Sequence, residues 1–280
     1  MKRVAIQGIR GSFHDIAAHQ YFQGEQLDII CCETFEQVFA SVKADPTIIA
    51  LVAIENTIAG SLLHNYELLR ASGLSVVGEH KLHISHSLLC LPDDDWDSLC
   101  EVNSHPVALM QCRQFLENHP SLKVVQGGDT ASSARAIAEG HMKGHCAICH
   151  KDNAAVYGLK VLEESIEDNK HNFTRFLVCT DPGKSAFMRP MESCDKASLV
   201  FTLPHEKGSL SQVLSILSFY DISLTKIQSL PLIGREWEYM FYIDVIYGNL
   251  TRFRQSVDAI TPLTSHLTIL GEYAAATKTN

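Results

Sequence analysis

The first two thirds of the chain alternate short apolar runs with longer segments whose apolar residues recur at helical spacing. Continuous apolar runs are typical of buried strands, and they predict strands over Val4–Ile6, Leu27–Cys32, Ile48–Ile54 and Lys123–Gln126. The amphipathic segments between them predict helices over Phe13–Phe22, Phe35–Lys43, Ser61–Ala71, Pro106–Glu117 and Ser132–Glu139. Alternation of this kind predicts an α/β fold with largely parallel sheets.

One long segment breaks this rhythm. Leu74–Leu91 stays strand-like for much longer than the usual strand of about 5–6 residues. The later run Arg175–Cys179 is expected to return alongside it. Two crossing segments would join two α/β lobes around a cleft, and small ligands favour such clefts.

After Thr180 the pattern changes. Asp181–Ser185 and Met188–Ser193 are rich in turn-forming residues and lack periodicity, which indicates a linker. The elements beyond it follow the ferredoxin-like order βαββαβ, over Ala197–Leu203, Gly208–Tyr220, Ile222–Leu230, Glu238–Ile246, Leu250–Ala259 and His266–Leu270. We therefore expect a first domain over residues 1–181, a linker over 182–195 and a second domain over 196–274. The lobes of the first domain are expected at residues 1–78 plus 165–181, and at 79–164.

The composition is that of a globular protein, with 46% hydrophobic and 20% charged residues. A net charge of -9 offers no basic face to nucleic acid. No apolar stretch approaches the roughly 20 residues needed to span a bilayer, and the first apolar run is too short for a signal peptide. We expect a soluble cytoplasmic protein that binds neither nucleic acid nor membrane.

Nine scattered cysteines lie mostly in apolar runs, which favours buried, reduced thiols. The sequence Cys146-Ala147-Ile148-Cys149-His150 matches the pattern for c-type haem attachment. That attachment would require export, and the same residues predict a buried strand. The 14 histidines show no His-x-x-x-His helix pair with a nearby acidic base, and no Ser-His-Asp order is visible, so we expect neither metal nor cofactor.

Three loops follow predicted strands and precede helices, where α/β sheets present their ligand sites. Gly8–Ser12 is either an anion site built from backbone N–H groups or a plain tight turn. Glu55–Ser61 and Gly128–Ser133 either carry ligand-binding groups or cap the following helices. Spacing alone leaves these alternatives open.

The segment Asn172-Phe173-Thr174-Arg175-Phe176 is more informative. An arginine between two phenylalanines, at the start of an apolar strand, is partly desolvated and requires a carboxylate partner. That partner is either a ligand or an internal Asp or Glu. The residues by themselves predict an α/β domain that binds a small anion, and they name no reaction.

Six segments, taken in order, resemble those of prephenate dehydratases with a C-terminal ACT regulatory domain: Gly8–Phe13, Glu55–Gly60, Ser104–Cys112, Tyr157–Leu159, Ile166–Asp168 and Asn172–Phe176. Thr57 replaces a serine of that pattern, and Asp129 replaces the serine before Thr130. The resemblance implies a two-lobed catalytic domain similar to a type-2 periplasmic-binding-protein fold, followed by a ferredoxin-like ACT domain.

Enzymes of that family remove carbon dioxide and a hydroxyl from prephenate, giving phenylpyruvate without a cofactor or metal. The resemblance implies that Thr174 assists departure of the hydroxyl, that Arg175 binds a substrate carboxylate and that Phe176 walls the ring. It also implies substrate contacts from Ser12, Glu55, Asn56, Thr57, Thr130 and Asn172. Two alternatives stay open: an arogenate dehydratase and a non-catalytic amino-acid sensor.

The second domain resembles a module that binds phenylalanine as a feedback effector. The implied effector residues are Gly208, Ser209, Leu210, Ser223, Leu224, Gln228 and Pro231. Gln228 and Leu230 replace a glutamate and an arginine of the family pattern, and Ser223 replaces an asparagine, so weaker effector binding or altered coupling is expected. The resemblance also implies a homodimer or homotetramer.

Overall fold

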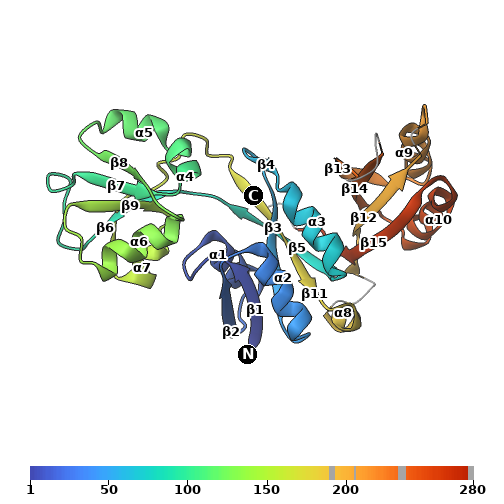
Figure 1. The fold of residues 1–280 in the computed structure, drawn as a ribbon, viewed down its shortest axis with the longest axis horizontal. Coiled ribbons are helices and arrows are strands. Elements are labelled where there is room, and N and C mark those ends of the chain that lie inside the picture. The colour runs from blue at the N-terminus through green and yellow to red at the C-terminus, as the bar shows by residue number, and fades with distance from the viewer. Residues whose placement is uncertain (189–192, 205, 233–237, 277–280) are drawn as a thin grey trace. The chain divides into compact units, whose positions relative to one another are not determined.

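The computed structural model describes residues 1–188, 193–204, 206–232 and 238–276 (Figure 1). The chain divides into two compact units, each assembled from several segments. The first unit comprises Met1–Val38, Leu51–Ser61 and Lys81–Phe176, and the second comprises Phe39–Ala50, Leu62–His80 and Leu177–Asn280. Strands β3 (Ile49–Asn56), β5 (Ser75–His83) and β11 (Phe173–Thr180) contribute residues to both units.

Within the first unit, one group of strands has the order β11-β3-β1-β2. β1 (Lys2–Gln7) and β2 (Leu27–Cys32) run parallel, with Lys2 opposite Leu27. The connecting helix α1 (Phe13–Tyr21) follows β1, and α2 (Phe35–Ala44) follows β2. β4 (Gly60–Ser61) folds back on β3 and pairs Ser61 with Glu55. The predicted α/β alternation is confirmed here.

A second sheet of the first unit has the order β10-β6-β9-β7-β8. β7 runs parallel to both β8 and β9, whereas β6 and β10 are antiparallel to their neighbours. Buried aliphatic side chains such as Leu88, Val102 and Ile148 form its core. The elements are β6 (Ser87–Cys90), β7 (Glu101–Ser104), α4 (Pro106–Gln111), α5 (Arg113–Asn118), β8 (Lys123–Gln126), α6 (Thr130–Glu139), β9 (His145–Cys149), α7 (Asn153–Tyr157) and β10 (Lys160–Glu163).

Two boundary predictions in this region are wrong. The long run Leu74–Leu91 is two strands, β5 and β6, which belong to different sheets and are separated at residues 84–86. The expected helix Pro106–Glu117 is two short helices. Cys112 divides them because its φ of -114° and ψ of 29° leave the helical region.

The segment between β5 and β6 lies beside the segment that leads into β11. The backbone N–H of Ile84 donates to the carbonyl of Asn172 at 2.8 Å. The backbone N–H of His86 donates to the carboxylate of Glu167 at 2.7 Å. The chain therefore returns alongside β5, as the two strand-like runs predicted.

The C-terminal part of the second unit has the order βαββαβ, which confirms the predicted ferredoxin-like pattern. Its strands have the order β13-β14-β12-β15, and β15 touches β5 at Gly271 and Val76. A side chain at Gly271 would place its Cβ 2.0 Å from the Val76 carbonyl oxygen, so only glycine fits. The elements are β12 (Lys196–Leu203), α9 (Ser209–Phe219), β13 (Ser223–Pro231), β14 (Tyr239–Ile246), α10 (Leu250–Ile260), the 3-10 turn η2 (Thr261–Leu263) and β15 (Ser265–Tyr273).

The second unit also contains α3 (Leu63–Ser72) and α8 (Pro182–Met188). The expectation of an aperiodic linker from residue 182 onward is wrong for 182–188, which are helical. Pro182 suits the first helical turn, where its missing N–H needs no partner. Residues 189–192 of the expected linker lie outside the described residues.

A buried ion pair adds to the second unit. The Lys196 ammonium lies 2.7 Å from the Glu79 carboxylate, and each residue is only 4% exposed. The backbone N–H of Ala276 donates to the same carboxylate at 2.9 Å. Glu79 is therefore held by a charge and a backbone donor together, which is what a desolvated carboxylate requires.

The helices are short throughout the part of the chain that the structure describes. The longest, α9 and α10, have 11 residues each. None of the described helices has the length and apolar character needed to cross a bilayer.

Candidate functional site

The loop after β3 is fastened to the start of β11 by the side chain of Asn56. Its Oδ1 accepts hydrogen bonds from the backbone N–H groups of Ile58 and Ala59, at 2.9 and 2.8 Å. Because both partners are donors, the amide orientation is determined, and the Nδ2 group must point the other way. Nδ2 faces Asn172 and Thr174 of the first unit.

Thr174 receives a hydrogen bond rather than giving one in this contact. Asn56 Nδ2 lies 3.0 Å from Thr174 Oγ1 and 2.7 Å from Asn172 Oδ1. A threonine hydroxyl has one proton and two acceptor lone pairs. Since the amide uses a lone pair, the Thr174 proton stays available to a group outside this contact, and the hydroxyl is oriented by a fixed neighbour.

Asn172 lies beneath this contact and is completely buried. Its Oδ1 is used by Asn56, whereas its Nδ2 is a buried donor with no hydrogen-bond partner among the described residues. Buried donors are nearly always paired in native proteins. An unpaired donor adjacent to Thr174 therefore marks this position as one where a polar group of a ligand would be stabilised.

Thr57 ties the same loop to the backbone of β11. Its Oγ1 donates to the carbonyl of His171 at 3.1 Å and accepts from the N–H of Phe173 at 2.9 Å. The backbone N–H of Thr57 also donates to the Phe173 carbonyl at 2.9 Å. The hydroxyl proton is thus used within the protein. This is a tethering role, unlike the substrate contact that the resemblance implied.

Arg175 has an internal carboxylate partner, the alternative that the sequence left open. Its Nε lies 2.7 Å from Glu55 Oε1, and the arginine is only 5% exposed. Glu55 is the residue before Asn56, so one loop supplies both the carboxylate for Arg175 and the amide for Thr174. The ion pair and the amide contact together fix the register of this loop against β11.

Phe176 is 1% exposed and lies in the core. Its ring packs edge-to-face on His14 of α1, with ring centroids 5.0 Å apart. This packing supports the strand that carries Thr174. The implied contact of Phe176 with the substrate ring stays a prediction.

His14 was not foreseen from the sequence, because nothing in its neighbourhood distinguishes it from a helical surface position. Its Nε2 accepts from the backbone N–H of Ala53 at 3.4 Å, and burial lowers the pKa of His14 to about 4. The imidazole is therefore neutral at pH 7 and braces β3 and β11 from behind.

The glycine loop before α1 does not form an anion cradle. The N–H of Gly11 donates to the Asp15 carboxylate at 2.7 Å, and the N–H of Ser12 donates to the Ile9 carbonyl. Ser12 caps α1 by accepting from the N–H of Asp15 at 3.3 Å. A carboxylate and a helix cap occupy the donors that an anion would need, so the tight-turn alternative holds here.

The loop before α6 is likewise a helix cap. Asp129 accepts from the N–H of Ser132 at 2.7 Å, and the Ser132 hydroxyl returns a bond to Asp129. This reciprocal pairing is a capping box. No hydrogen bond joins the Thr130 hydroxyl to any described residue, and Thr130 makes no direct contact with Thr174 through such bonds.

A second cluster of polar side chains, around His86, was also not predicted from the sequence. His86 is 1% exposed; its Nε2 lies 2.9 Å from Gln111 Oε1, and its ring meets Phe13 edge-to-face at 5.6 Å. Burial lowers the pKa of His86. Glu167, 2% exposed, accepts from the His86 N–H. These partners are up to 81 residues apart in sequence, so only the tertiary structure brings them together.

The effector residues implied by the resemblance lie in the second unit. Gly208 begins α9 with a φ of +85°, which favours glycine, and Leu210 packs on the core of this domain. Gln228 donates its Nε2 to the Ser229 carbonyl at 3.0 Å, and Leu230 is 7% exposed. Ser223, Leu224 and Pro231 lie on the same edge strand, β13.

The thiols of the haem-like pattern, Cys146 and Cys149, are buried. Burial raises the pKa of Cys146 to about 12 and that of Cys149 beyond the usual range of thiols. Groups of three or more His, Cys, Asp or Glu side chains with metal-binding geometry are absent from the described residues. Cys146 and Cys149 lie on β9, the buried strand that the sequence predicted.

The first unit thus presents a polar loop and strand that hold a threonine hydroxyl and a buried amide, on an α/β scaffold followed by a ferredoxin-like region. A family model, prephenate dehydratase, matches residues 4–184. The chain therefore belongs to the prephenate dehydratase family.

Three similar proteins illustrate this relationship. An Arabidopsis thaliana arogenate dehydratase/prephenate dehydratase 6, chloroplastic, is 36% identical over 291 residues, covering 97% of this chain and 68% of the relative. A prephenate dehydratase from Arthrobacter aurescens, solved with L-Phe, is 27% identical with a TM-score of 0.84, covering 97% of this chain and 89% of the other. GqqA, described as a novel type of quorum-quenching acylase, is 28% identical with a TM-score of 0.88, covering 98% of both chains.

Proposed function

We propose that this chain catalyses the decarboxylating dehydration of prephenate to phenylpyruvate, water and carbon dioxide, and that Thr174 is its catalytic residue. The observation that carries the proposal is the hydrogen bond from Asn56 Nδ2 to Thr174 Oγ1 at 3.0 Å. It leaves the hydroxyl proton for the departing group. A donor held in place by a fixed amide stabilises developing negative charge more effectively than solvent does.

The chemistry needs few groups from the protein. The carbon–carbon bond to the ring carboxylate breaks, carbon dioxide leaves, and its electron pair enters the ring. The ring hydroxyl leaves as hydroxide, which takes up one proton from solvent to become water, and the ring becomes aromatic. Thr174 donates a hydrogen bond to that oxygen as negative charge develops on it. A threonine hydroxyl is a weak acid, so it acts as a positioned donor.

The remaining predicted contacts have different support. Asn172 Nδ2, buried and without a partner among the described residues, suits a substrate oxygen. Ser12 and Thr130 keep hydroxyl groups that could contribute, although no hydrogen bond connects either to Thr174. Asn56, Glu55 and Thr57 order the loop. We assign these last three to positioning, with Asn56 acting directly on Thr174.

Arg175 remains a proposed contact for a substrate carboxylate, and its pairing with Glu55 sets the test. Arg175→Lys should raise the Michaelis constant by about tenfold, because lysine cannot maintain Glu55 and the fork geometry together. Steady-state kinetics with prephenate would measure this. An unchanged Michaelis constant and turnover number would remove Arg175 from the substrate site and leave it as the structural partner of Glu55.

The substrate itself has two candidates. The Arabidopsis relative carries both activities in its name, which favours testing arogenate beside prephenate. A direct assay would offer each substrate to the purified chain and follow phenylpyruvate and phenylalanine. Turnover of prephenate well above that of arogenate is the expected result. Preference for arogenate would change the substrate but keep the chemistry, and turnover of neither would favour a binding protein.

The similarity to GqqA suggests testing this chain for acylase activity as well, although we do not propose that activity. An acylase needs an activated nucleophile, usually a hydroxyl or thiol beside a general base. The Thr174 hydroxyl accepts from an amide and has no base among its described hydrogen-bond partners. We therefore expect no acylase activity under conditions in which prephenate is consumed.

We further propose that phenylalanine binds the C-terminal region, as an ACT domain would, and that the chain forms a homodimer or homotetramer. The Arthrobacter aurescens structure, solved with L-Phe, supports this assignment. The glycine start of α9 and the edge strand β13 carry the implied effector residues. Calorimetry with millimolar phenylalanine should detect binding. The absence of both heat and a thermal shift would reject it.

A further inference from the structure

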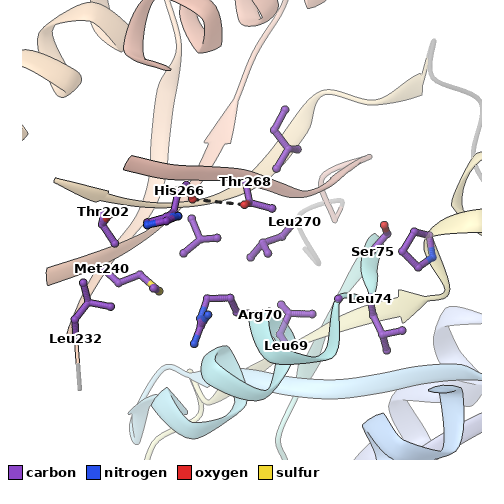
Figure 2. Close-up of a pocket in the computed structure, with 14 residues that line it drawn as sticks. Leu69, Arg70, Leu74, Ser75, Thr202, Leu232, Met240, His266, Thr268 and Leu270 are labelled. Atoms are coloured by element: carbon purple, nitrogen blue, oxygen red, sulfur yellow. Dashed lines mark hydrogen bonds between the residues drawn. The ribbon is translucent and has the colours of Figure 1, made fainter. Parts of the chain in front are cut away.

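A cavity of about 620 Å³ lies within the second unit (Figure 2). Residues from the end of α3 and the start of β5 form one side, and residues from β12, β14 and β15 form the other. Ligand pockets generally occupy about 300–1,000 Å³. The cavity is therefore large enough for a small organic molecule, and it contains none of the residues assigned above to the substrate or the effector.

Charge distinguishes this cavity from the rest of the molecule. Arg70 is the permanently charged residue among its described lining, which holds no carboxylate. Arg70 is exposed, and its described side-chain partner is the uncharged hydroxyl of Tyr242 rather than a carboxylate. On a chain with a net charge of -9, a cavity with a local positive charge selects anions.

The presence of an arginine at position 70 has an ordinary explanation that does not involve a ligand. A cation in the last turn of a helix interacts favourably with the helix dipole, and Arg70 lies there in α3. That explanation does not account for the hollow beside it. Arg70 and the strand residues His266 and Thr268 line the same space, as Figure 2 shows.

On the strand side of the cavity, a side-chain hydrogen bond from β12 fixes the start of β15. Thr202 donates its hydroxyl to the Ser265 carbonyl at 3.0 Å. The next residue, His266, has a φ of +55°, which is unfavourable for a residue with a side chain. The Thr268 hydroxyl donates to the His266 carbonyl at 3.5 Å, so the imidazole of His266 is the second polar group available to an anion in the cavity.

The remaining lining is largely aliphatic. Leu69, Leu74, Leu232, Met240 and Leu270 contribute apolar surface from α3, β14, β15 and the segments that flank the strands. No Phe, Tyr or Trp ring lines the described part of the cavity. A ligand that satisfies one guanidinium and covers aliphatic side chains has one carboxylate and a short branched or unbranched apolar body.

We infer that this cavity is a binding site for a small aliphatic monocarboxylate, with Arg70 meeting the carboxylate and the leucine and methionine side chains covering the apolar end. The site is independent of the proposed reaction, because binding is measured without turnover. Its ligand differs from the aromatic substrate and effector of the proposed function. Failure of one assignment therefore leaves the other intact.

The test uses 4-methylpentanoate as the probe and 4-methylpentan-1-ol as its uncharged match, each titrated into the full chain by calorimetry. We expect saturable binding of the acid and at least tenfold weaker binding of the alcohol. Arg70→Gln should weaken the acid at least tenfold. The control Arg113→Gln removes an arginine of α5 in the first unit, paired with Glu117 at 2.7 Å, and should leave acid binding unchanged.

A second variant guards against an indirect effect of the lost charge. Thr268→Trp places a large side chain in the cavity from an exposed strand position and leaves Arg70 unsubstituted. It should abolish binding of the acid. Thermal unfolding reports whether each variant is folded. The inference is overturned by the absence of acid binding to the native chain, by equal binding of acid and alcohol, or by binding that survives both substitutions in folded protein.

Discussion

Polar side chains are held differently in two regions of the molecule. One region is the contact between the loop after β3 and β11 in the first unit, and the other is the edge strand β13 of the second unit. In the first, Asn56 makes hydrogen bonds to five partners across two segments that are more than 100 residues apart. In the second, the partner of the Gln228 amide among the described residues is the carbonyl of the next residue. A group fixed from several directions can orient a catalytic hydroxyl, whereas a locally bonded amide is free to be replaced.

The departures from the family pattern follow the same division. The substitution at Thr57 keeps the hydroxyl that ties the loop to β11, so it changes little. Leu230, where the family has an arginine, is buried at 7% exposure and has exchanged a charge for packing. Loss of both charges on β13 alters what that strand can bind. The comparison therefore predicts that catalytic activity is retained and that the response to phenylalanine differs from the family pattern.

The strongest test of the catalytic half is Thr174→Ala. We expect turnover of prephenate to fall by about 10²–10³-fold, the usual cost of removing one positioned donor. Thr174→Ser keeps the hydroxyl and should retain most of the activity. Steady-state kinetics and a melting curve would separate lost chemistry from lost folding, and near-normal turnover of the alanine variant would refute the assigned role.

Asn56→Asp sharpens the comparison because it keeps the shape but replaces the Nδ2 donor, which faces Thr174 Oγ1, Asn172 Oδ1 and the Phe173 carbonyl, with an acceptor. An aspartate still accepts from the N–H groups of Ile58 and Ala59, but its second oxygen would attract the Thr174 proton. We expect turnover to fall roughly 10–100-fold, corresponding to about 1.4–2.7 kcal/mol.

The matched control is Asn169→Asp, on the exposed segment before β11, where the side-chain oxygen accepts from the His171 N–H and remains an acceptor. It should leave turnover near the native value. Equal losses in the two variants would mean that added charge, rather than the diverted proton, causes the effect.

The bracing role of His14 gives a pH dependence of stability. Its pKa is about 4 in the folded chain, against about 6.5 when unfolded, so the unfolded state binds more protons between these values. Its contribution is complete above pH 6.5 and is lost as the pH falls through 4, by roughly 3 kcal/mol at most.

Denaturant unfolding at several pH values would measure this contribution. His14→Gln should flatten the loss between pH 6.5 and 4, because glutamine can accept from Ala53 without titrating. The exposed His64→Gln should leave the profile unchanged. A native-like profile in the His14 variant would show that its burial does not govern acid stability.

The smallest expected effect tests the regulatory half. Gln228→Glu restores one of the two charges of the family pattern, and we expect phenylalanine affinity to rise by a few-fold, about 1 kcal/mol or less for a partly exposed ion pair. Ser229→Glu, the next residue and on the other face of β13, serves as the control. Calorimetry showing equal changes for both would attribute the effect to net charge alone.

Sequence patterns foresaw most of the fold but misplaced several boundaries. Alternating apolar runs identified β1, β2 and β3, and the βαββαβ order of the C-terminal region was recovered completely. The errors came where two elements follow without a turn signal: β5 and β6 read as one strand, and α4 and α5 read as one helix. β7 and β10 were not predicted, although β8, a strand of the same length, was.

The sequence by itself determined the family, since six short segments in order specify it, and it placed Asn56 and Thr174 in the same site. The tertiary structure decided what each residue does. Only packing shows that Arg175 pairs with Glu55, that Phe176 lies in the core against His14 and that Thr57 bonds the backbone of β11. Side-chain identity fixes which hydrogen bonds and charges are possible, but partners distant in sequence determine which of them are already used.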